Sequence, residues 1–159
     1  MSIVSDVFGS GFELYDFLSK KSKVKNVSRR MVIRELRNNI KRLEQRNNRD
    51  IDRRRLIENL ENEQILLAIS SGFKFNSLAP KREVDNAILK VFPVAKRNMG
   101  WDADRIISSI DEKIVSLKET IDLYADINTA PVNITSRLNN LYLLLVLLTL
   151  LIKESNSKK

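Results

Sequence analysis

Residues 141–152, LYLLLVLLTLLI, are apolar except at Tyr142 and Thr149, which are only weakly polar. A helix of twelve residues rises about 18 Å, against about 30 Å for the hydrocarbon core of a bilayer. Arg137 and two asparagines precede the stretch and prevent its easy extension. We therefore expect no transmembrane segment. A helix that is apolar on all sides is normally surrounded by others, so the stretch predicts the centre of a helical bundle.

Five further segments show apolar residues at helical spacing, over residues 2–19, 28–47, 50–70, 80–99 and 102–124. Only four Gly and three Pro occur in the 159 residues, which favours long helices over many short strands. The predicted fold is all-α, an antiparallel bundle of five or six helices around the apolar C-terminal helix at 132–154. Residues 1–154 form one domain in this interpretation, and residues 155–159 form a polar C-terminal tail.

Three local patterns add detail to this fold. Residues 65–69 are apolar nearly all round, so we expect that helix end to be covered on several sides. Pro93 falls inside an apolar pattern and should kink or end its helix. The helix at 102–124, capped by Asp102, carries a regular apolar seam that we expect to pack within the chain, with a homodimer as the alternative. The seam comprises Ala103, Ile107, Ile110, Ile114, Leu117, Ile121 and Tyr124.

Composition excludes several classes of chemistry. The chain has no Cys and no His, which removes thiolate nucleophiles, the commonest general base and the commonest metal ligand. No convergent group of Asp, Glu, Lys or Tyr replaces them, so we expect a protein that is not an enzyme and has no cofactor or metal. The first residues lack the basic leader of a signal peptide, and we expect a cytoplasmic protein.

Charge is distributed unevenly along the chain. Between Lys20 and Arg55 there are fifteen basic and four acidic residues, a net charge of +11, whereas the whole chain carries +8. Spacings of four, three and four residues put Arg30, Arg34, Arg37 and Lys41 on one helical flank, and Arg53 and Arg54 belong to the next predicted helix. These six residues are the predicted polyanion-binding residues.

A dense basic face attracts polyanions, and arginine suits bidentate contact with phosphate. Our leading hypothesis is a non-enzymatic binding protein whose basic helix face contacts nucleic-acid backbone, within a larger assembly. Aromatic residues are absent from the basic window, which disfavours base stacking on single strands. The alternatives are an adaptor or inhibitor that captures an acidic protein, a merely solvated basic face, and a peripheral membrane protein that uses the amphipathic segment 2–19.

Overall fold

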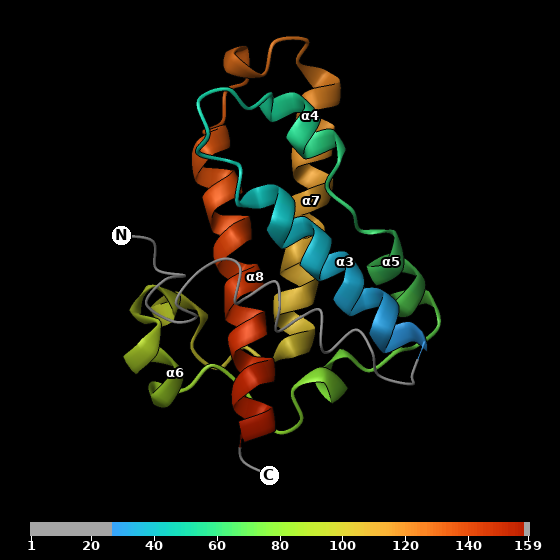
Figure 1. The fold of residues 1–159 in the computed structure, drawn as a ribbon, viewed down its shortest axis with the longest axis vertical. Coiled ribbons are helices and arrows are strands. Elements are labelled where there is room, and N and C mark those ends of the chain that lie inside the picture. Colours follow the sequence, from blue (N-terminus) through green and yellow to red (C-terminus); the bar gives the residue numbers. More distant parts are fainter. Residues whose placement is uncertain (1–26, 158–159) are drawn as a thin grey trace.

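The computed structural model describes residues 27–157, of which 72% are helical and none form a strand. The predicted all-α fold is confirmed. Figure 1 shows two long helices running side by side, with the first described helix crossing them. The predicted helix 2–19 and the basic residues at 20–26 lie outside the described residues. The helices are α3 (Val27–Leu43), α4 (Arg53–Glu58), α5 (Glu63–Ser70), α6 (Asn86–Val91), α7 (Ala103–Leu123) and α8 (Ile134–Ser157).

Helix α8 is the centre of the core, as its sequence predicts. Leu145 and Leu148 are each 1% exposed, and the residues from Leu144 to Ile152 are all buried. The helix continues to Ser157, so the first three residues of the predicted tail are helical. By length and composition alone, 23 of its residues, Ile134–Asn156, could cross a bilayer, contrary to the expectation from residues 141–152. However, 67% of its most apolar window is buried inside the protein, as in the core helix of a soluble bundle.

Helix α7 packs along α8 through the predicted seam. The seam residues from Ala103 to Ile121 are buried, whereas Tyr124 at the end is half-buried and Val115, outside the seam, is exposed. Asp102 caps the helix by accepting a hydrogen bond from the backbone N–H of Arg105, at 3.0 Å. The seam is therefore satisfied within one chain.

The prediction of a single helix at 50–70 is wrong, because α4 and α5 are separate helices. Two side chains of α3 cause the break between them. The side-chain amide of Asn39 pairs with the backbone of Glu61, donating to its carbonyl oxygen at 2.7 Å and accepting from its N–H at 2.8 Å. The Glu35 carboxylate then accepts from the N–H groups of Gln64 and Ile65, at 2.7 and 3.0 Å. These contacts hold the non-helical residues between α4 and α5 against α3, and α5 begins there.

Helix α5 is also less covered than its composition predicts. Ile65 and Ala68 are buried against α3, but Leu66, Leu67 and Ile69 are 45%, 62% and 47% exposed. The expectation that this helix end is covered on several sides is wrong for the described residues, because α5 is short and contacts the bundle through one face.

The segment between α5 and α7 is built from short turns. Pro93 ends α6 and begins the 3₁₀ helix η2 (Pro93–Asn98), as predicted. Pro80, expected near a helix start, instead lies in a turn, and Asp85 caps α6. Backbone hydrogen bonds join Val84 to Gly100 and Trp101, so the two ends of the segment that contains α6 and η2 are held together. Figure 1 shows α6 and α3 on opposite sides of α8.

Candidate polyanion-binding surface

The predicted basic flank lies on α3, opposite the apolar stripe that buries the helix. Val32, Ile33, Leu36, Ile40 and Leu43 form the buried stripe. On the other side Arg30, Arg34 and Lys41 are exposed, and Arg37 is half-buried. We call these four residues the α3 flank.

The members of the α3 flank differ in how much they already interact. Among the described residues, Arg30 and Arg34 have no hydrogen bond or ion pair with another side chain or with backbone acceptors. Arg37 and Lys41 each interact with another residue of the chain. Arg30 and Arg34 are therefore the flank residues most open to an external anion.

No acidic residue of α3 offsets this charge. Glu35 is the one acidic residue of the helix, and it is 2% exposed because it caps α5. Burial raises the pKa of the Glu35 carboxyl, and the backbone hydrogen bonds from Gln64 and Ile65 lower it only in part. The carboxyl group points into the α3–α5 contact and not toward the flank.

Other arginines of the basic window have structural roles. Arg29 donates to the carbonyl oxygen of Ser77 at 2.9 Å, and Arg42 pairs with Glu61 at 2.9 Å. These contacts fasten both ends of α3 to the segment that follows it. The fifteen cations counted in the sequence therefore overstate the charge that α3 offers to a partner.

Arg53 and Arg54 lie apart from the α3 flank, at the start of α4, which packs mainly against α7. Arg54 donates to the carbonyl oxygens of Tyr124 and Ala125, at 3.1 and 3.4 Å, and pairs with Glu58 at 3.2 Å. Arg53 is half-buried and has no hydrogen bond or ion pair among the described residues. The six predicted residues thus divide between two surfaces.

Arg53 and Arg54 share a pocket of about 460 Å³ with Arg46 and Arg49. We call it the arginine pocket. The turn after α3 contributes Arg46 and Arg49, α4 contributes the other two, and the 3₁₀ helix η3 (Ile127–Thr129) closes one side. Helical spacing did not predict a role for Arg46 and Arg49, because they fall at a predicted helix end and in the break after it, where there is no periodic pattern.

Arg46 is held more rigidly than a surface arginine. Its guanidinium stacks over the Tyr142 ring at 4.0 Å from the centroid, and donates to Asn139 Oδ1 at 2.7 Å and to the Leu43 carbonyl at 3.0 Å. Burial lowers the pKa of Arg46, while Tyr142 and Glu44 raise it. Burial, with the nearby Glu44 carboxyl, raises the pKa of Tyr142 to about 12.

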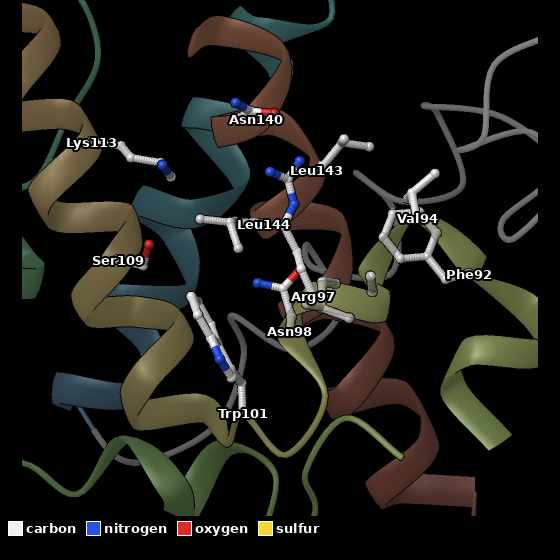
Figure 2. A pocket seen from close by; sticks show the side chains of 12 residues that line it. Phe92, Val94, Arg97, Asn98, Trp101, Ser109, Lys113, Asn140, Leu143 and Leu144 are labelled. Carbon is white, nitrogen blue, oxygen red and sulfur yellow. The ribbon is translucent and has the colours of Figure 1, made fainter. Parts of the chain in front are cut away.

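A second hollow, of about 140 Å³, lies between η2, α7 and α8 (Figure 2). Figure 2 shows Lys113 and Ser109 on α7 across from Asn140 and Leu144 on α8, with Trp101 at one end. No carboxylate lines it, so it lacks paired acids for acid–base chemistry. Among residues 27–157 no three acidic side chains come together as a metal site.

No protein-family model, curated protein or solved structure matches the chain. The function must therefore be inferred from the chain's own residues.

Proposed function

We propose that this chain is a non-enzymatic binding protein that contacts nucleic-acid backbone through the α3 flank. The observation that carries the proposal is the pair Arg30 and Arg34, which are exposed and have no partner among the described residues. A helix presenting unpaired guanidinium groups at a spacing of four residues suits a row of phosphates, since arginine binds phosphate bidentately.

Two further features support this proposal. The buried stripe of α3 anchors the helix and directs the flank outward, so binding would require no rearrangement of the core. Glu35 is occupied at the start of α5, so it does not compete with phosphate for the flank. Backbone contacts of this kind carry no base specificity, so binding should be independent of sequence.

The test is the affinity of the full chain for a fluorescent DNA duplex at low salt, measured by anisotropy. We expect R30A/R34A to bind more weakly for every duplex sequence tried. The matched control is K90A/K96A, which removes two exposed cations from α6 and η2. Equal loss in both variants would indicate non-specific dependence on net charge, and unchanged affinity in R30A/R34A would exclude the α3 flank.

An acidic protein partner is the second candidate, and one observation favours it. Leu66, Leu67 and Ile69 of α5 are exposed apolar residues. The first turn of the same helix lines a groove against α3, together with Arg34, Glu35 and Glu61. Protein interfaces combine apolar patches with arginine in this way. Copurification of an acidic protein that L67D releases, without loss of DNA affinity in that variant, would favour this candidate.

A further inference from the structure

The arginine pocket differs from the α3 flank in shape, and the difference bears on its ligand. A helix flank touches a strand from one side. In the pocket, Arg46 and Arg49 come from the turn after α3, while Arg53 and Arg54 come from α4. A group that enters the pocket therefore lies near arginines from both segments.

Two of these arginines are held in place. Arg54 is fixed by the carbonyl oxygens of Tyr124 and Ala125 and by Glu58, and Arg46 by its stacking on Tyr142. Neither uses its second terminal nitrogen, Nη2, in a hydrogen bond within the described part of the chain. Prior fixation lowers the entropy cost of binding.

The other two arginines are available. Arg49 is exposed and Arg53 half-buried, and neither has a hydrogen bond or ion pair among residues 27–157. Asp52 also lines the pocket, but one of its carboxylate oxygens already accepts from the Arg55 N–H at 3.2 Å. Four arginines against one aspartate give the lining a formal charge of +3, which the ion pair between Arg54 and Glu58 reduces to +2.

This lining fits a dianion better than a monoanion. A phosphate diester within a strand carries one negative charge, whereas a phosphate monoester carries about −1.5 to −2 at pH 7. The volume of about 460 Å³ falls within the range of about 300–1,000 Å³ that is usual for small-ligand sites. The pocket therefore has room for a phosphate and its attached sugar.

We infer that the arginine pocket binds the terminal phosphate monoester of a nucleic-acid strand. This inference rests on the proposed function, and adds recognition of a strand end to the backbone contacts of α3. Arg49 and Arg53 offer guanidinium groups that have no partner among the described residues. Arg46 and Arg54, which other residues hold in place, add positive charge nearby.

The test compares two duplexes of one sequence, with 5′-phosphate or 5′-hydroxyl ends, by anisotropy on the full chain. We expect the phosphorylated duplex to bind about tenfold more tightly, the effect of one charge-assisted contact. R49A/R53A should abolish this ratio. R30A/R34A should lower the affinity for both duplexes and leave the ratio of the two affinities unchanged. If R49A/R53A folds poorly, R49K/R53K takes its place. It keeps the positive charge but loses the bidentate geometry of arginine, so it should reduce the ratio of the two affinities.

The outcomes separate the two proposals. Equal affinity for both duplexes in wild type, with loss in R30A/R34A, would overturn the terminal-phosphate inference and leave the proposed function standing. No binding of either duplex at low salt would overturn the proposed function. A nucleoside 5′-monophosphate that binds as tightly as the phosphorylated duplex would assign the pocket to a free nucleotide and overturn the strand-end inference.

Discussion

Replacing Glu35 by alanine should destabilise the protein strongly, although the residue is acidic and lies in the basic window. Its carboxylate caps α5 from another helix, accepting from the N–H groups of Gln64 and Ile65. Without it, the N–H of Ile65, a residue that is 0% exposed, loses its acceptor at a buried position. The N–H of half-buried Gln64 recovers part of its loss from water.

The magnitude follows from these two groups. A buried donor left without an acceptor costs about 1–3 kcal/mol, and loss of a helix cap costs about 0.5–2 kcal/mol. We expect E35A to lower the free energy of unfolding by about 2–4 kcal/mol. In a chain of this length that corresponds to a fall in Tm of about 4–16 °C.

Urea unfolding followed by circular dichroism measures this loss. The matched control is E63A, since Glu63 is exposed in the first turn of α5 and should change stability by less than about 0.5 kcal/mol. If E35A were no more destabilising than E63A, the capping argument and the explanation of the break before α5 would both be refuted.

E35A should also change how the stability of the protein depends on pH. Burial raises the pKa of Glu35 above its unfolded value, so the folded state holds the proton more tightly than the unfolded state. The stability that this proton contributes is fully present below about pH 4.5 and is lost as pH rises through the raised pKa. The difference in stability between wild type and E35A should therefore be smaller at pH 8 than at pH 4.

Two other predictions test the core and the Arg46–Tyr142 contact. L145A should lower the free energy of unfolding in urea by about 2–5 kcal/mol, because Leu145 is buried in α8. The control L123A, at a leucine that is 78% exposed, should change it little, and similar losses in both variants would place α8 outside the core. Y142F should remove a loss of stability that wild type shows between about pH 10 and 12, because the raised pKa of Tyr142 favours the neutral phenol only in the folded state; identical alkaline stability curves would contradict this.

Apolar periodicity was sufficient to predict the long elements. The buried stripe of α3 and the seam of α7 follow directly from it, because residues three and four apart share a helix face. Pro93 and Asp102 act locally, so their effects on helix ends were also predictable.

The break between α4 and α5 was not predictable in this way. It depends on Asn39 and Glu35 reaching backbone groups more than twenty residues away, and polar side chains inside a helix give no periodic signal for such contacts. Periodicity also overstated the burial of Leu66, Leu67 and Ile69, because it records which residues are apolar and not how many neighbours a short helix has.

For the candidate site, helical spacing predicted the α3 flank but not which arginines of α3 interact with other residues of the protein. Arg29 and Arg42 are equally basic in sequence, yet both are engaged within the protein. The arginine pocket combines the 46–54 segment with η3, and only tertiary structure brings these together.

The most direct test of the central claim is the salt dependence of affinity for a DNA duplex. Each phosphate neutralised contributes about 0.9 to the slope of log affinity against log salt concentration. R30A/R34A should flatten that slope by about 1.8 units relative to wild type, while K90A/K96A leaves it unchanged. A slope that R30A/R34A does not alter, in a protein that remains folded by circular dichroism, would contradict the assignment of α3 as the nucleic-acid surface.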